Sequence, residues 1–121
     1  MTNIESVEGS FDLAELTKMY DFTGKTVAIT GGAGVLGSEM AGALAGCGAK
    51  VAILDMNEEA GKALIERLGE RGKQLSFFKF NALDRESVAQ VAQDVIKSMG
   101  KLDCLINGAG GNKPQAKPAL N

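Results

Sequence analysis

The sequence of 121 residues contains no histidine, a single tyrosine and only two cysteines. Without histidine, neither a Ser-His-Asp nor a Cys-His catalytic arrangement can form, and the commonest ligand of transition metals is missing. Cys47 and Cys104 stand far apart in the sequence, which argues against a structural zinc site. Packing of reduced thiols in the protein interior is the favoured interpretation of both cysteines, and a redox role is the alternative.

Long apolar runs and basic runs are also missing. No apolar stretch approaches the roughly 18–20 residues of a membrane span. The first five residues, MTNIE, lack the basic start and apolar run of a signal peptide, so we expect a cytoplasmic protein. The net charge of −2, with no basic cluster, disfavours nucleic acid and membrane surfaces as partners. An apolar content of 45% predicts a globular domain with its own core.

The most informative segment is TGGAGVLG at residues 30–37, directly after a strand predicted over residues 25–30. Glycines let the backbone turn tightly and come close to a pyrophosphate. A helix predicted from Val35 to Cys47 would direct its free N–H groups and its positive dipole end at that phosphate. A second strand over residues 50–54 leads into Asp55, where a carboxylate can accept both hydroxyls of a ribose. This order of elements predicts a dinucleotide site.

Strands and helices continue to alternate after Asp55. Asn57 is predicted to cap a second helix with Ala60, Leu64 and Leu68 on its inner side, and Asp84 to cap a third. The third and fourth strands are predicted over residues 74–80 and 102–106. The inner stripe of the third helix is predicted to be Val88, Val91, Val95 and Met99, with Gly100 closing the helix.

Right-handed crossovers with a reversal after the third strand predict an α/β fold, a Rossmann-like doubly wound parallel sheet in the order 3-2-1-4. A ligand crevice then opens at the carboxyl ends of strands one and four. The turn after Thr30, and Asp55, Asn81 and Asn107, all fall at such ends. We expect a lead-in over residues 1–21 with a short helix over 11–19, a dinucleotide-binding half-domain over 22–111, and a loop over 112–121.

Residues 22–113 resemble the short-chain dehydrogenase/reductase superfamily. The resemblance rests on the turn at 30–37, on Asp55 and on NGAG at residues 107–110. The turn together with LINGAGGN at 105–112 is similar to sugar-acid reductases of the D-mannonate oxidoreductase (fructuronate reductase) type. The glycine spacing also resembles the extended branch of the superfamily, which acts on nucleotide sugars, but the block at Asn107 argues against that branch.

The sequence departs from the family pattern at Val35, Asn81 and Gly108. Glycine is commonest at the first of these positions, aspartate at the second and asparagine at the third. The aspartate of the family lies near the adenine; the Asn81 amide can still hydrogen-bond the adenine edge but brings no charge.

The resemblance implies hydride transfer between a nicotinamide and a carbonyl or alcohol substrate, such as the sugar acids fructuronate and mannonate. It implies that the turn holds the pyrophosphate, that Asp55 holds the adenosine ribose, and that Asn107 borders the nicotinamide-side ribose. Because the Asp55 carboxylate repels a 2′-phosphate, we expect NAD rather than NADP. The implied cofactor-binding residues are Gly31, Ala33, Gly34, Val35, Leu36, Gly37, Asp55, Met56, Asn81, Ala82, Asn107, Ala109 and Gly110.

The family's catalytic serine, tyrosine and lysine have no counterpart here. Tyr20 is the only tyrosine, precedes the first strand, and has Gly24 where the lysine would stand. We therefore expect an inactive chain that forms the amino-terminal portion of a longer enzyme, a homo-oligomer when complete. A non-catalytic dinucleotide-binding or regulatory module is the alternative. Asn81 and Asn107 also have an alternative interpretation, as residues that only shape their turns.

Overall fold

Four strands form a single parallel sheet in the computed structural model, which describes residues 12–108. The strands are β1 (Thr26–Thr30), β2 (Lys50–Asp55), β3 (Leu75–Lys79) and β4 (Cys104–Asn107). They lie in the order β3-β2-β1-β4, and every neighbouring pair is parallel. The chain adds β2 and β3 on one side of β1 and then crosses over to add β4 on the other side. The predicted Rossmann-like order is therefore confirmed.

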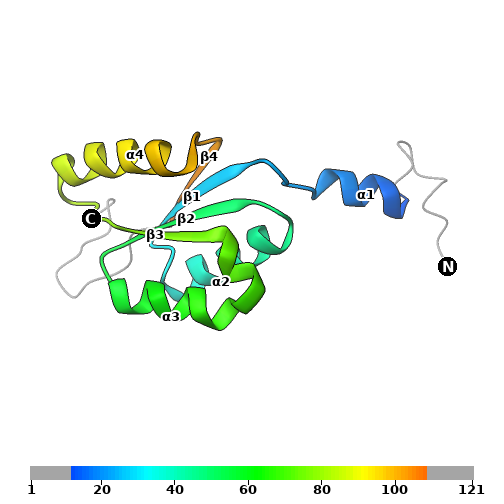
Figure 1. Cartoon of the computed structure of the whole chain (residues 1–121), viewed down its shortest axis with the longest axis horizontal. Helices are drawn as coiled ribbons and strands as arrows, with labels where there is room; N and C mark the ends of the chain where they lie inside the picture. Colours follow the sequence, from blue (N-terminus) through cyan, green and yellow to red (C-terminus); the bar gives the residue numbers. More distant parts are fainter. Residues whose placement is uncertain (1–11, 109–121) are drawn as a thin grey trace, which may run out of the picture.

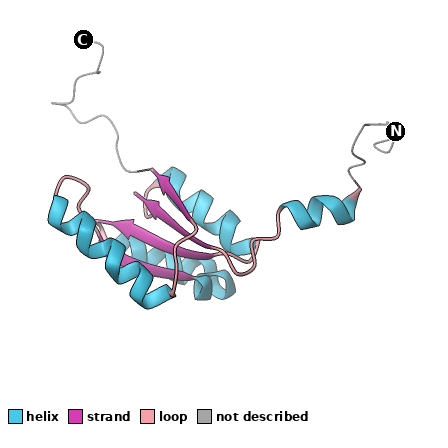
Figure 2. Cartoon of the chain, turned by 90° about the horizontal axis from the view of Figure 1, so that it is seen from above, coloured by secondary structure: helices cyan, strands magenta, loops and turns pink. Residues whose placement is uncertain are grey.

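Helices cover both faces of the sheet. On one face lie α2 (Val35–Gly46) and α3 (Glu58–Leu68), and α4 (Arg85–Met99) lies on the other (Figures 1 and 2). A 3₁₀ helix, η2 (Gly69–Gln74), connects α3 to β3. One face of the sheet therefore carries two helices and the other carries one in the described part of the chain.

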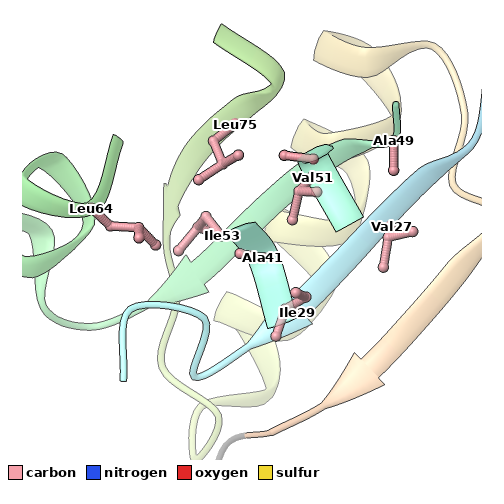
Figure 3. Close-up of a cluster of buried hydrophobic side chains, with 9 residues drawn as sticks. Val27, Ile29, Ala41, Ala49, Val51, Ile53, Leu64 and Leu75 are labelled. Atoms are coloured by element: carbon pink, nitrogen blue, oxygen red, sulfur yellow. The ribbon is translucent and has the colours of Figure 1, made fainter. Parts of the chain in front are cut away.

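The core is split into two clusters by the sheet. Val51 and Ile53 of β2 point to the α2/α3 side, where Figure 3 shows them beside Val27, Ile29 and Ala41. Ala52 and Leu54 point to the α4 side and join the second cluster, which includes Val91 and Val95. Strands buried on both faces are typical of parallel sheets, and this explains the unbroken apolar run of residues 51–54.

Small residues let α2 and α3 lie close to the sheet. The buried residues of α2 are Gly37, Ser38, Ala41, Gly42 and Ala45, while Leu36 is 72% exposed. In α3, Gly61 is buried under the ring of Phe77, whose Cδ1 and Cε1 would collide with any side chain at that position. Short distances between helix and sheet are therefore built into the sequence.

A short helix, α1 (Leu13–Met19), precedes the sheet and projects away from it (Figure 1). Its amino-terminal cap is Asp12, whose Oδ1 accepts the Glu15 N–H at 2.8 Å. None of its residues is buried. The helix predicted over residues 11–19 is thus confirmed for 13–19, and Phe11 lies outside the described residues.

Two sequence-based predictions need correction. The fourth strand begins at Cys104 rather than Leu102. The Asp103 N–H still donates to Thr26 O at 2.9 Å, but the Thr26 N–H donates to the Asp103 side-chain Oδ2 at 2.8 Å instead of to a backbone carbonyl. Val88 is 42% exposed, so the inner stripe of α4 begins at Val91. Between residues 12 and 108, no helix has the length and apolar character needed to cross a membrane.

Candidate functional site

The register of the sheet brings the predicted site residues to one edge. Thr30 is the register partner of Leu54 on one side and of Asn107 on the other, and Asp55 is the partner of Lys79. The carboxyl ends of the four strands therefore meet here. The residues that follow them gather along this edge.

The glycine turn crosses the edge between β1 and α2. Gly31, at φ 68°, donates its N–H to Leu54 O at 2.7 Å, which ties the turn to the end of β2. A left-handed φ of this kind favours glycine. A Cβ atom at Gly37 would collide with Gly31 O and approach Gly32 Cα to 2.8 Å. The first turn of α2 thus lies directly against the glycine turn.

The amino terminus of α2 is open. Its cap residue is Gly34, and among the described residues no side chain caps this helix and no acidic residue lies in its first turn. The first N–H with a partner inside the helix is that of Ser38, which donates to Gly34 O at 2.8 Å. The N–H groups of Val35, Leu36 and Gly37 precede the hydrogen-bond ladder and, with the positive dipole end, are available to an anion.

Asp55 links the end of β2 to the glycine turn. Its Oδ2 accepts the Ala33 N–H at 3.1 Å, and its Oδ1 accepts the Asn57 N–H at 3.0 Å. Each carboxylate oxygen has a second acceptor position, so the group can still accept hydroxyls of a ligand. Asp55 does not cap the next helix, because Asn57 caps α3 and accepts the Ala60 N–H at 3.0 Å.

Asn81 begins the loop after β3. Its backbone N–H donates to Ser87 Oγ at 3.1 Å and its Oδ1 accepts the Leu83 N–H at 3.0 Å. The preceding N–H, of Phe80, donates to Asp55 O at 3.0 Å, so this loop is tied to the end of β2. Ala82 is exposed in this loop. Met56, which follows Asp55, is 61% exposed.

Asn107 ends β4 on the other side of the turn. Its Oδ1 accepts the Thr30 hydroxyl at 2.7 Å, and the Gly108 N–H donates to Thr30 O at 3.0 Å. These bonds join the ends of β1 and β4, so Asn107 does shape the edge of the sheet. Ala109 and Gly110 lie outside the described residues.

Two residues of the site were missed by sequence reasoning. Lys79 is exposed and is the register partner of Asp55, which places a cation on the same face of the sheet. Counting residues along aligned strands could have identified it. Ser87 accepts the backbone N–H of Asn81 from the first turn of α4, a contact for which the sequence carries no signal.

This arrangement fits a dinucleotide. Free N–H groups and a helix dipole suit a pyrophosphate, and a carboxylate one strand away suits the adjoining ribose diol. The Gly37 contact leaves no room for a side chain between the turn and the helix, so the surface at this point is made of backbone. Residues 12–108 contain no group of three or more His, Cys, Asp or Glu side chains suited to a metal ion.

Comparison with known proteins identifies relatives of similar sequence. An uncharacterized oxidoreductase of Bacillus subtilis, UxuB, is 44% identical over 96 residues, which cover 79% of this chain and 34% of that protein. The L-fucose dehydrogenase of Oryctolagus cuniculus is 36% identical over 93 residues, covering 77% of this chain and 31% of the enzyme. The chain thus spans about a third of the length of the curated relatives that it matches.

Solved structures share the fold. A Haemophilus influenza protein provisionally assigned as a D-mannonate oxidoreductase, with bound NAD, superposes with a TM-score of 0.73 at 35% identity over 82% of this chain and 35% of that one. An NAD⁺-bound xylitol dehydrogenase gives a TM-score of 0.70 at 33% identity over 74% of this chain and 35% of that one. The family model for short chain dehydrogenases matches residues 25–121. The chain belongs to the short-chain dehydrogenase family.

Proposed function

We propose that this chain is the NAD(H)-binding portion of an oxidoreductase that transfers hydride between nicotinamide and a carbonyl or alcohol substrate. The observation that carries the proposal is the open amino terminus of α2 with the Asp55 carboxylate hydrogen-bonded to the same turn at 3.1 Å. Pyrophosphate and ribose require these two groups side by side. The NAD bound in the two solved relatives supports the choice of cofactor.

The residues of this chain bind and orient the cofactor. The N–H groups of Val35, Leu36 and Gly37 hold the pyrophosphate, together with the backbone around Gly31, Ala33 and Gly34. Asp55 holds the adenosine ribose, with Met56, Asn81 and Ala82 bordering the adenine. Asn107, Ala109 and Gly110 border the nicotinamide-side ribose. When bound, the nicotinamide supplies the hydride chemistry.

Asp55 also determines the preference for NAD. A carboxylate at the ribose accepts a free 2′-hydroxyl and repels a 2′-phosphate. Lys79, the register partner of Asp55, is a cation on the same face of the sheet. The ion pairs of the described residues do not include one between Lys79 and Asp55. The negative charge of Asp55 therefore remains available to repel a phosphate.

The substrate of the whole protein is proposed to be a polyhydroxylated compound, with a sugar acid such as fructuronate or mannonate as the first candidate. The names of the relatives support this class: a D-mannonate oxidoreductase, an L-fucose dehydrogenase, a xylitol dehydrogenase and a D-threitol dehydrogenase. The catalytic serine, tyrosine and lysine of the family have no counterpart in this sequence, so we propose that the chain by itself is inactive. A cytoplasmic location and a homo-oligomeric whole enzyme remain proposals.

Calorimetric titration of the 121-residue chain with NAD and with NADP tests this function. We expect NAD to bind more tightly, and Asp55→Asn to weaken NAD binding about tenfold, because a charged hydrogen bond contributes roughly 1.5–3 kcal/mol. NADP binding should improve in the same variant. Asp84→Asn is the matched control, because Asp84 also follows a strand but caps α4, and asparagine caps equally well. Tighter binding of NADP, or no binding of either dinucleotide, would overturn the proposal.

A further inference from the structure

The order of the strands gives the direction in which a dinucleotide lies on the sheet. The pyrophosphate belongs at the turn after β1, and the ribose at Asp55 after β2. The base is attached to the far side of that ribose, so it extends toward the next strand outward, which is β3. Asn81 begins the loop after β3, and the Phe80 N–H ties this loop to Asp55 O at 3.0 Å. Asn81 is therefore placed at the edge of the base.

The hydrogen bonds of Asn81 identify its amide oxygen and nitrogen and show which positions remain available to a ligand. Its Oδ1 accepts the Leu83 N–H at 3.0 Å, and a side-chain NH₂ group cannot accept that bond. Its backbone N–H is occupied by Ser87 Oγ at 3.1 Å. Among the described residues no acceptor is bonded to Nδ2, and the side chain is only partly buried. Asn81 therefore offers a ligand the Nδ2 donor and, beside it, the second acceptor position of Oδ1.

An amide that can both donate and accept at this place discriminates weakly between two purines. The edge of adenine presents the N1 acceptor next to the N6 amino donor, whereas hypoxanthine presents the O6 acceptor next to the N1–H donor. The Nδ2 group finds one acceptor on either base. A carboxylate would instead accept from the N6 amino group of adenine and face the O6 oxygen of hypoxanthine without a proton between them.

We propose that Asn81 lets this chain accept either adenine or hypoxanthine as the base of the dinucleotide. A nicotinamide dinucleotide that carries hypoxanthine then binds about as well as NAD. This inference rests on the proposed function, since it assumes that the dinucleotide occupies the site. It assigns to Asn81 a role in specificity that its identity as a turn residue does not require.

The test is calorimetric titration of the chain with NAD and with nicotinamide hypoxanthine dinucleotide. We expect the two affinities of the wild type to agree within about threefold, and Asn81→Asp to favour NAD by about tenfold, because an unpaired polar group is then left facing the wrong base. The ratio of the two affinities is independent of any general weakening of the site. Asn57→Asp is the matched control: it adds the same charge at the cap of α3, where aspartate is an equally good cap, and should leave the ratio unchanged.

The outcomes separate the two proposals. If neither dinucleotide binds, the proposed function fails and this inference fails with it. If NAD binds but the wild type already prefers it tenfold and Asn81→Asp leaves that ratio unchanged, only the role of Asn81 is overturned. If Asn57→Asp changes the ratio as much as Asn81→Asp does, the effect is one of charge alone and the assignment to Asn81 is wrong.

Discussion

The amino terminus of α2 differs from those of α3 and α4. The cap of α3 is Asn57, with two glutamates in the first turn, and the cap of α4 is Asp84, with Glu86 in the first turn. In α2 the cap is Gly34, and neither a capping side chain nor an acidic residue accompanies it in the described structure. All three helices follow strands of the same sheet, so the difference lies in the chemistry of their first residues.

The comparison shows how a helix end is kept available to a ligand. A capping side chain contributes about 1 kcal/mol of stability by occupying N–H groups. In α3 and α4 the cap side chain occupies one of those groups, whereas in α2 no side chain of the described residues does so. If the proposed phosphate site is correct, α2 lacks the stability of a cap because its amino terminus is kept free to bind, and variants can test both the stability and the binding.

The largest effect is expected from Gly37→Val. The new Cβ would collide with Gly31 O, so the turn and the helix must separate. We expect the free energy of unfolding to fall by about 1–3 kcal/mol, as for other overpacked sites, and NAD binding to disappear. Urea denaturation and calorimetry measure the two quantities.

Gly42→Ala is the control in the same helix. Its Cβ would lie 3.4 Å from Leu68 Cδ2, which is an ordinary contact. We expect stability to rise by up to about 1 kcal/mol, because alanine is favoured over glycine in a helix, with NAD affinity unchanged. NAD binding by Gly37→Val at the wild-type level would contradict the role given to the turn.

Gly34→Asp converts the end of α2 into one like that of α4. At φ −75° and ψ 178° the backbone suits aspartate, and the new Cβ would lie 3.3 Å from Gly31 O, which requires a small shift. Stability should stay within about 0.5 kcal/mol, because glycine and aspartate are both accepted caps. NAD affinity should fall by more than about tenfold, since a negative charge then faces the phosphates.

Gly34→Ser separates the cap from its charge. The hydroxyl occupies an N–H group of the first turn without repelling a phosphate, so the loss of NAD affinity should be smaller than for Gly34→Asp. If both variants bind NAD as the wild type does, the open end of α2 is not the phosphate site.

Asn57→Ala removes the cap of α3 and leaves its backbone in place. We expect a loss of about 1 kcal/mol in the free energy of unfolding. NAD affinity should change little, because the Asn57 backbone N–H, which donates to Asp55 Oδ1 at 3.0 Å, remains. Thermal unfolding with and without NAD distinguishes the two effects. A fall in affinity as large as that of Gly34→Asp would show that α3 also contributes its end to the ligand.

The smallest effect is expected for Asp103, which lies at the amino-terminal ends of β1 and β4, away from the candidate site. The Thr26 N–H, which donates to Asp103 Oδ2 at 2.8 Å, lowers the pKa of that carboxyl; burial opposes the shift, and Lys101 at 3.2 Å adds to it. Because the pKa is lower in the folded state, the contribution of Asp103 to stability is complete above the ordinary carboxyl pKa and is lost as the pH falls through the folded value.

Asp103→Asn keeps an acceptor oxygen but does not titrate. We expect it to be less stable than the wild type at pH 7, with the difference shrinking below about pH 4. Urea denaturation across this range gives the two curves. Parallel curves would show that the hydrogen bond to Thr26 does not depend on the charge.

Much of the site could be predicted because it follows directly from positions along the chain. The end of β1, the start of α2 at Val35 and the carboxylate after β2 are separated by regular elements, and the alternation of strands and helices determines which ends share an edge. The caps Asn57 and Asp84 were predicted for the same local reason, since a cap bonds to N–H groups two or three residues away.

Other features depend on contacts between distant segments. The four-residue spacing of Leu36, Met40 and Leu44 predicts a helix, but the buried side of α2 is made of smaller residues because the helix lies close to the sheet. Lys79 faces the same side as Asp55 only through the register of β2 and β3. The orientation of the Asn81 amide depends on Leu83 and could not be predicted from its type.

The contact between Gly61 and Phe77 bears on Asp55, the proposed ribose ligand. The Gly61 N–H donates to Asn57 O at 3.1 Å, and the Asn57 N–H donates to Asp55 Oδ1 at 3.0 Å. A methyl group at residue 61 would push α3 away from the Phe77 ring and strain these two hydrogen bonds. We therefore expect a substitution at Gly61 to weaken coenzyme binding although residue 61 does not touch the ligand.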